Sequence, residues 1–171
     1  MPSLSASPRA LGLAAVCAAA LLDQAHKFWM LHVFGIEGRQ PVTVAPFLDL
    51  VLSWNYGVSY SLFPAHEGAG RALLLSGQAM IVAFLLSWMW RAQSRLTAIA
   101  LGLVVGGAVG NALDRIARGA VADFFYLHTT LPVGPLANYV FNVADVAITA
   151  GVALLLFETL FPPPPPAESA A

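Results

Sequence analysis

Four long apolar stretches, separated by polar connections, dominate the chain. Each approaches the ~20 residues that an α-helix needs to cross the hydrocarbon core of a bilayer. Polar and turn-forming residues between the stretches mark the connections. The pattern predicts an all-α membrane protein with four transmembrane helices, over residues 11–34, 72–90, 96–113 and 140–161.

The connections between these stretches differ in length. Residues 91–95 form a short basic turn, whereas the first and third connections are long. The first contains FLDLVLSW and then NYGVSYSLFP, whose β-branched and aromatic residues favour strands, so we expect a small extramembrane β-sheet or cradle there. The third, over 116–139, contains glycines and prolines typical of an elaborate loop. One membrane domain over 1–162 is predicted, followed by a Pro-rich disordered tail over 163–171.

Composition agrees with a bilayer environment and excludes some functions. Of the 171 residues, 58% are hydrophobic and 10% are charged, with a mean hydropathy of +0.74, unlike a soluble domain. The formal net charge of -1 gives no indication of nucleic-acid binding. Cys17 is the single cysteine, so neither a disulfide framework nor a thiolate metal site is expected. A cleaved signal peptide is disfavoured, because the first apolar stretch continues past Asp23 and Lys27.

An even number of spans puts both termini on one side of the membrane. Arginines are divided almost equally between the two sides, so the positive-inside rule does not decide the orientation. The tight basic turn at 91–95 favours termini in the cytoplasm and long loops on the outer side.

Polar residues of the spans gather toward the face that carries the long loops. In the spans these are Asp23, Lys27, Asn111, Asp114, Arg115, Asn142 and Asp145, and in the loops Asn55 and Asp123. An ionisable residue inside a membrane costs on the order of 2.5–3.5 kcal/mol and usually marks a functional site. The clustering predicts a single polar site at one membrane interface.

Structural explanations compete with function for some of these residues. Asp23 and Lys27 are four residues apart on one helical face, which allows them to neutralise each other. Asp114 and Arg115 lie near a helix end, where a structural ion pair or an interfacial anchor is as reasonable as a functional role. Asp145 has apolar neighbours and no cation within four residues, so a functional role is favoured.

Other motifs add little chemistry. Gly106 and Gly110 form a G-x-x-x-G pattern typical of close helix packing. His66-Glu67 lacks the second histidine of H-E-x-x-H, so no metal site is expected, and no G-x-S-x-G elbow is present. Acid–base chemistry is therefore assigned to the carboxylates.

Five short motifs follow one another along nearly the whole chain. They are Asp23-Gln24-x-x-Lys27, Asn55-x-Gly57, Gly106-Gly107-x-x-Gly110-Asn111-x-x-Asp114-Arg115, Gly119-x-Val121-x-Asp123-Phe124 and Phe141-Asn142-x-Ala144-Asp145. In this order and at this depth, the set resembles lipoprotein signal peptidases (signal peptidase II, aspartyl protease family A8). The chain departs from that pattern at Tyr60, where phenylalanine is expected, and in a longer connection between Asp123 and Asp145.

The resemblance implies that Asp123 and Asp145 form a catalytic pair. Two carboxylates held close together cannot both ionise cheaply, so such a pair shares a proton near neutral pH. The ionised partner would activate a water that attacks the scissile carbonyl. The protonated partner would polarise that carbonyl and later protonate the leaving amine.

Supporting roles follow from the same resemblance. Asn111 and Asn142 would orient the two aspartates, and Arg115 would bind the substrate backbone or brace the site. Asn55 and Gly57 would belong to the cradle in the first loop. Asp23 and Lys27 would support the site structure, and Asp114 is assigned to structure alone.

The substrate implied by the resemblance is a diacylglyceryl-modified prolipoprotein, cut just before its lipidated cysteine after lateral entry from the membrane lipid. The expected location is the bacterial cytoplasmic (inner) membrane with the active site toward the periplasmic face. Inhibition by globomycin-type cyclic peptides and the absence of cofactors are also expected. The alternatives are a small proton-coupled membrane transporter, which predicts acidic groups spread across the bilayer, and a membrane assembly factor.

Overall fold

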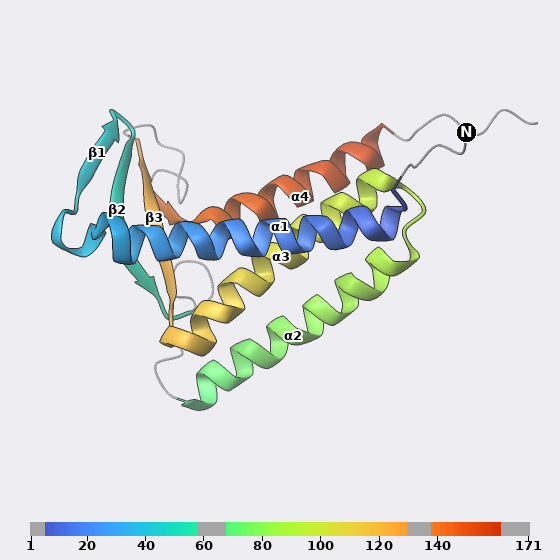
Figure 1. Cartoon of the computed structure of the whole chain (residues 1–171), viewed down its shortest axis with the longest axis horizontal. Coiled ribbons are helices and arrows are strands. Elements are labelled where there is room, and N and C mark those ends of the chain that lie inside the picture. The colour runs from blue at the N-terminus through green and yellow to red at the C-terminus, as the bar shows by residue number, and fades with distance from the viewer. Residues whose placement is uncertain (1–5, 58–67, 130–137, 162–171) are drawn as a thin grey trace, which may run out of the picture.

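The structure is a computed structural model that describes residues 6–57, 68–129 and 138–161. Long helices run lengthwise, and a small sheet lies at one end of them (Figure 1). The helices are α1 Pro8–Phe28, α2 Gly68–Arg91, α3 Arg95–Arg118 and α4 Val143–Leu160, and α1 continues into a π-helical segment η1 Trp29–Phe34 and a 3-10 turn η2 Ile36–Gly38. The strands are β1 Val42–Ala45, β2 Leu48–Asn55, β3 Val121–His128 and β4 Asn138–Phe141.

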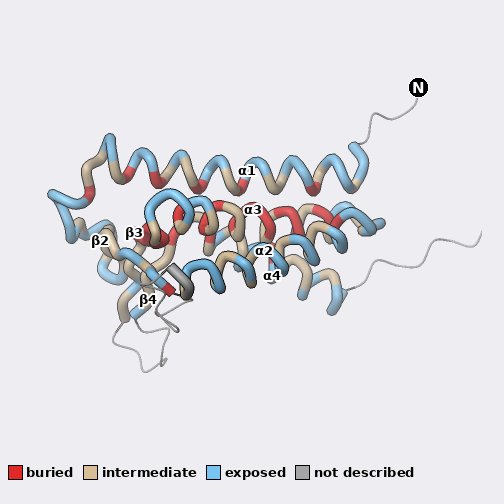
Figure 2. Tube along the Cα trace, turned by 90° about the horizontal axis from the view of Figure 1, so that it is seen from below, coloured by how far each residue is buried: buried red, intermediate tan, exposed pale blue. Residues whose placement is uncertain are grey.

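Helix α3 forms the centre of the bundle and packs against α1, α2 and α4. Buried residues are concentrated along it, whereas the outer faces of the other helices are exposed (Figure 2). Glycines allow the close approach: a Cβ on Gly106 would lie 2.6 Å from the carbonyl oxygen of Val16 on α1. Gly110 has a different neighbour, because a Cβ there would lie 2.5 Å from Oδ2 of Asp23. Gly106 therefore allows α3 to pack closely against α1, while Gly110 leaves space for the carboxylate of Asp23.

Substitution of Gly106 tests this packing. We expect Gly106→Ala to lower the free energy of unfolding by about 1–3 kcal/mol, because the added methyl overpacks the contact between α1 and α3. The matched control is Gly77→Ala on α2, where a Cβ would meet no atom within 4 Å. That change should leave stability unchanged or raise it by up to about 1 kcal/mol. Unfolding in detergent measures both, and equal effects would contradict the packing explanation.

Three helices among the described residues are long and apolar enough to cross a membrane: Gly70–Arg91, Arg95–Arg118 and Val143–Leu160. Their outer faces expose large apolar side chains such as Phe84 and Leu156, as contact with lipid requires. Helix α1 is not among these three, and its last two turns contain Asp23 and Lys27. The crossing of α1, and with it the expectation of four spans, stays a prediction.

Helix α4 begins three residues after the start predicted for the last span. Residues 138–141 belong to β4, and the helix begins at Val143 because Asn142 has an extended backbone (φ -130°, ψ -178°) and caps it. Asp145 therefore lies in the first turn of α4, nearer the sheet than a start at residue 140 implied. Helix α3 also differs from the expected range, since it continues past residue 113 until Gly119, with φ +83°, ends it.

The sheet is antiparallel in the order β1-β2-β3-β4. Strands β1 and β2 come from the first connection, where strands were predicted, whereas β3 and β4 come from the third, which was predicted only as a loop. In the register of β2 and β3, Ser53 pairs with Asp123 and Asn55 with Val121. A buried core of Met30, Ile36, Ala122 and Phe124 supports the sheet. The pairing holds Asp123 next to Asn55 at the end of the helix bundle.

Candidate active site

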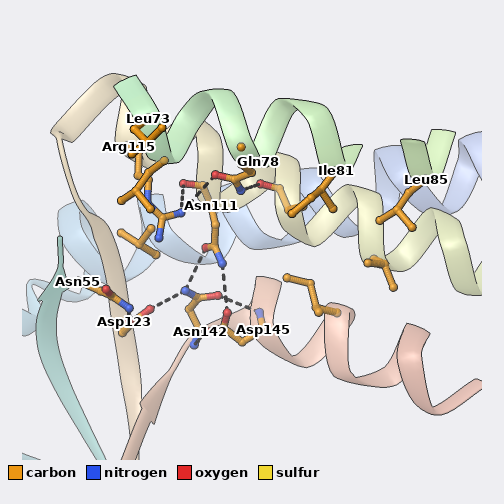
Figure 3. A pocket seen from close by; sticks show the side chains of 16 residues that line it. Asn55, Leu73, Gln78, Ile81, Leu85, Asn111, Arg115, Asp123, Asn142 and Asp145 are labelled. Atoms are coloured by element: carbon orange, nitrogen blue, oxygen red, sulfur yellow. Dashed lines mark hydrogen bonds between the residues drawn. The ribbon is translucent and has the colours of Figure 1, made fainter. Parts of the chain in front are cut away.

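A cavity of about 490 Å³ opens between α2, α3, α4 and the start of β3. Polar side chains gather at one end of it, and Ile81 and Leu85 of α2 line its wall farther along (Figure 3). The polar residues that line it are Asn55, Gln78, Asn111, Arg115, Asp123, Asn142 and Asp145. Six of these seven were predicted as site residues from the sequence, and the structure brings them to a single cavity.

Asp123 reaches the cavity from β3. Its side chain accepts two hydrogen bonds, one from Asn142 Nδ2 to Oδ1 at 2.5 Å and one from Asn55 Nδ2 to Oδ2 at 3.3 Å. The residue is only 3% exposed, so these amides replace most of the water around the carboxyl group. The side chain of Asn55 is itself held in place by a local hydrogen bond, because its Oδ1 accepts the N–H of Gly57 at 3.1 Å.

Asp145 reaches the same cavity from the first turn of α4. A capping box holds it there: Asp145 N donates to Asn142 Oδ1 at 3.0 Å, and Asn142 N donates to Asp145 Oδ2 at 3.1 Å. The other carboxylate oxygen accepts from Asn111 Nδ2 at 3.1 Å. Such a box satisfies helix N–H groups that have no partner within the helix.

The side chain of Asn142 contacts both aspartates. Its side chain contacts Asp123 through Nδ2 and the backbone of Asp145 through Oδ1, and Nδ2 also donates to Asn111 Oδ1 at 3.1 Å. Figure 3 shows Asp123 and Asp145 on either side of it. The two aspartates, distant in the chain, are thus linked by a single side chain.

The environment of Asp123 changes its acidity. Burial, and after it repulsion by Asp145, raise the pKa of its carboxyl from 3.8 to about 7. Hydrogen bonds from Asn142 and Asn55 and the charge of Lys27 oppose the increase. A carboxyl group with this pKa can hold a proton near neutral pH, which an acid–base pair requires.

The raised pKa predicts how stability depends on pH. Between the ordinary pKa of 3.8 and about 7, the folded chain holds a proton at Asp123 that the unfolded chain has lost. The contribution of Asp123 to the free energy of unfolding therefore falls as the pH rises through this range, and it levels off above it. Because Asn does not titrate, the stability of the wild type minus that of Asp123→Asn should decrease between pH 4 and pH 8. Denaturation of both proteins across this range measures the difference, and a constant or rising difference would contradict the assignment.

Arg115 braces the cavity from α3. Its Nη2 donates to the carbonyl of Gly57 at 2.7 Å, and its Nη1 lies 3.4 Å from Gln78 Oε1. Gln78 Nε2 donates to the carbonyl of Ala108 at 2.6 Å, so Gln78 links α2 to α3 and to Arg115. Gln78 was not predicted as a site residue, although an amide within an apolar span was a signal for it.

Asp23 and Lys27 lie beside the cavity without lining it. Lys27 Nζ is 2.8 Å from Asp23 Oδ2, which agrees with a mutually neutralising pair, but it is also 2.8 Å from Asp114 Oδ2. All three side chains are fully buried. Asp114 therefore pairs with Lys27 and, at 2.6 Å, with Arg118 rather than with its neighbour Arg115.

Some expectations fall on other parts of the chain. Tyr60, His66 and Glu67, together with the Pro-rich tail, lie outside the described residues. Cys17 is exposed on α1. Over 6–57, 68–129 and 138–161, no three His, Cys, Asp or Glu side chains are grouped as metal ligands would be.

Comparison with known proteins identifies the family. Residues 15–161 match the sequence model of the family described as signal peptidase (SPase) II. The chain belongs to the signal peptidase II family. The lipoprotein signal peptidase of Beijerinckia indica subsp. indica is 52% identical over 152 residues, which cover 89% of either protein. That of Methylobacterium sp. (strain 4-46) is 53% identical over 154 residues, covering 90% of this chain and 91% of the relative.

A solved structure supports the fold. A bacterial membrane enzyme determined by the in meso method at 1.9 Å resolution aligns with a TM-score of 0.71 over 89% of this chain and 94% of that chain. At 22% identity this likeness bears on the fold alone. Signal peptidase II enzymes are proteases of lipoprotein processing, so the prediction of that family is confirmed, and the transporter and assembly-factor hypotheses are set aside.

Proposed function

We propose that the chain is a membrane-embedded aspartyl endopeptidase that removes the signal peptide from diacylglyceryl-modified prolipoproteins. It cuts on the N-terminal side of the lipidated cysteine and needs no cofactor. The observation that carries the proposal is the meeting of Asp123 and Asp145, from separate segments, on the single side chain of Asn142 beside a cavity.

The proposed chemistry divides proton transfer between the two carboxyl groups. One is ionised and takes a proton from a water molecule, whose oxygen attacks the scissile carbonyl. The other is protonated, donates a hydrogen bond to that carbonyl oxygen and later gives a proton to the leaving amine. The raised pKa of Asp123 supports a pair that holds one proton near neutral pH. No covalent enzyme intermediate forms.

The cavity suits a substrate that is part peptide and part lipid. Asn55, Gly57 and Arg115 offer polar groups for an extended peptide backbone near the aspartates, in agreement with a cradle formed by the first loop. Ile81 and Leu85 supply an apolar wall along α2 for the signal peptide or the acyl chains. Globomycin-type cyclic peptides would inhibit by occupying the same cavity.

The proposed location is the bacterial inner membrane, crossed four times, with both termini in the cytoplasm. The sheet, whose strand β3 contains Asp123, and the first turn of α4 lie at one end of the bundle, and the α2–α3 turn and the described N-terminus lie at the other (Figure 1). The site would therefore open at the periplasmic face, where both water and lipid are available.

Cleavage of defined substrates tests the proposal. The purified protein in lipid should cut a diacylglyceryl-modified prolipoprotein directly before the modified cysteine, and mass spectrometry of the products identifies the bond. The matched control is the same precursor without lipid, which should be cut at least about 100-fold more slowly if the acyl chains contribute binding energy in the transition state. Equal rates for the two precursors, or cleavage at another bond, would overturn the assigned substrate.

A further inference from the structure

A buried charge cluster lies behind the two candidate catalytic aspartates. Lys27 Nζ stands 2.8 Å from both Asp23 Oδ2 and Asp114 Oδ2. Gln24 Nε2 also bridges the two carboxylates, at 3.1 Å from Asp23 Oδ2 and 3.2 Å from Asp114 Oδ1. We call Asp23, Lys27 and Asp114 the buried triad.

Each carboxylate of the buried triad holds one backbone N–H group. Asp23 Oδ1 accepts from Ala144 N at 2.9 Å, and Asp114 Oδ2 accepts from Ala122 N at 3.2 Å. Ala144 directly precedes Asp145, and Ala122 directly precedes Asp123. The two anchors therefore lie one residue before the two carboxyl groups of the proposed dyad.

Regular secondary structure gives these two N–H groups few alternative partners. Ala144 lies in the first turn of α4, where N–H groups have no acceptor within the helix. Strand β4 pairs with β3 only over Phe125–His128, so β4 offers no acceptor to Ala122, whereas Trp54 of β2 lies opposite it in the register of the other pairing. Both alanines are fully buried, and a lost partner would leave an unsatisfied polar group.

Lys27 also controls the direction of an amide in the site. Its Nζ donates to Asn111 Oδ1 at 3.0 Å, and Asn142 Nδ2 donates to the same oxygen at 3.1 Å. Because the oxygen of Asn111 faces these two donors, its Nδ2 faces Asp145 Oδ1, to which it donates at 3.1 Å. Replacement of the ammonium would remove one of the two groups that fix this orientation.

Charge neutralisation alone does not explain this arrangement. Asp23 with Lys27 would suffice to lower the insertion cost of α1, yet a second carboxylate, Asp114, is buried beside them and needs Arg118 as a further partner. Breaking such a buried network is costly, and well-packed apolar residues often stabilise a core equally well. Apolar residues could not accept the two backbone N–H groups. The carboxylates of Asp23 and Asp114 do so, and Lys27 holds them at a fixed separation.

We propose that the buried triad is a positioning device that sets the separation of Asp123 and Asp145 by anchoring the backbone directly before each of them. This inference rests on the proposed function for its catalytic consequence, but its geometric content does not. Asp114, which the sequence analysis assigned to structure alone, thereby becomes a positioning residue equivalent to Asp23.

Amide hydrogen exchange tests the anchors without any substrate. In the full-length protein, Asp114→Ala should accelerate exchange at Ala122 about tenfold or more and leave Ala144 nearly unchanged. Asp23→Ala should do the reverse, and Lys27→Met should accelerate both. If every variant loosened both amides equally, or neither, the inference would be overturned. If an alanine variant does not fold, Asp114→Asn or Asp23→Asn replaces it and should accelerate exchange at the same single amide, to a smaller extent because Asn keeps an acceptor oxygen.

Kinetics test the consequence for catalysis. Each alanine variant should lower kcat by about 10- to 100-fold with KM changed less than about threefold, because misplaced reacting groups slow the chemical step. Asp114→Asn, which keeps an acceptor oxygen, should recover part of kcat. The matched control is Glu158→Gln, which weakens a hydrogen bond between α3 and α4 (Thr97 Oγ1 to Glu158 Oε2) away from the site and should leave kcat within about twofold.

The two readouts separate the two proposals. The wild type could fail to cleave lipidated precursor while the variants still show selective amide exchange at Ala122 and Ala144. That result would support the positioning device and reject the proposed function. A fall in kcat for Glu158→Gln equal to that of the alanine variants would show general loosening instead and would overturn the positioning role.

Discussion

Asp123→Asn and Asp145→Asn should each lower kcat/KM for a lipidated prolipoprotein by about 10²- to 10⁴-fold, the range that positioned acid–base groups contribute. An amide can neither take the proton of the attacking water nor give one to the leaving amine. The kcat/KM of the double variant should be about the same as that of the less active single variant, because the two groups act as one unit and their effects do not add. Steady-state cleavage in lipid measures all three.

Asp49→Asn is the matched control for these variants. Asp49 lies on β2, in the same sheet, and its Oδ2 is 3.2 Å from His128 Nε2. It is not among the residues that line the cavity, so activity should stay within about twofold of the wild type. The dyad assignment would fail if either single variant kept wild-type activity while folded, or if the two effects multiplied in the double variant.

The candidate site was largely predictable because its residues occupy recognisable motifs at one membrane interface. Asp145 stood out as a carboxylate in an apolar span without a nearby cation, and that argument needs no structure. Asp123 lies in a connection, where an aspartate is unremarkable, so only the resemblance marked it. The structure places both side chains on Asn142, and their catalytic roles stay proposals.

Contacts between helices were not predictable to the same degree. The pairing of Asp23 with Lys27 follows from a spacing of four residues within one helix. The pairing of Lys27 with Asp114 depends on how α1 and α3 are rotated against each other, which no spacing in the sequence gives. For the same reason Gln78 was missed, since its partners Ala108 and Arg115 belong to another helix.

The boundary between β4 and α4 shows a limit of hydrophobicity itself. Asn138–Phe141 is short and apolar at its end, and it runs directly into the apolar residues of the helix. An apolar run of this kind is compatible with a strand or a helix. The stronger signal was Asn142 followed three residues later by Asp145, a spacing that resembles a helix N-terminus with reciprocal capping.

Substitution of Asn142 should show that one side chain serves both stability and catalysis. Asn142→Ala removes the acceptor for Asp145 N and the donor to Asp123. We expect the free energy of unfolding to fall by about 1–2 kcal/mol through loss of the N-cap. We also expect kcat to fall about 100-fold, because the lost amide donates to Asp123 and also to Asn111, whose own amide donates to Asp145.

Asn142→Ser separates the two roles. A serine hydroxyl is a good N-cap, so stability should stay within about 0.5 kcal/mol of the wild type. A serine has no amide group to donate at once to Asp123 and Asn111, as Asn142 Nδ2 does. Its kcat should therefore stay at least about tenfold below that of the wild type. Measured side by side, restored stability with restored activity would mean that Asn142 acts only as a cap. Restored stability without activity would mean that the Asn142 amide, directly at Asp123 and through Asn111 at Asp145, holds the two carboxyl groups in the arrangement that acid–base catalysis requires.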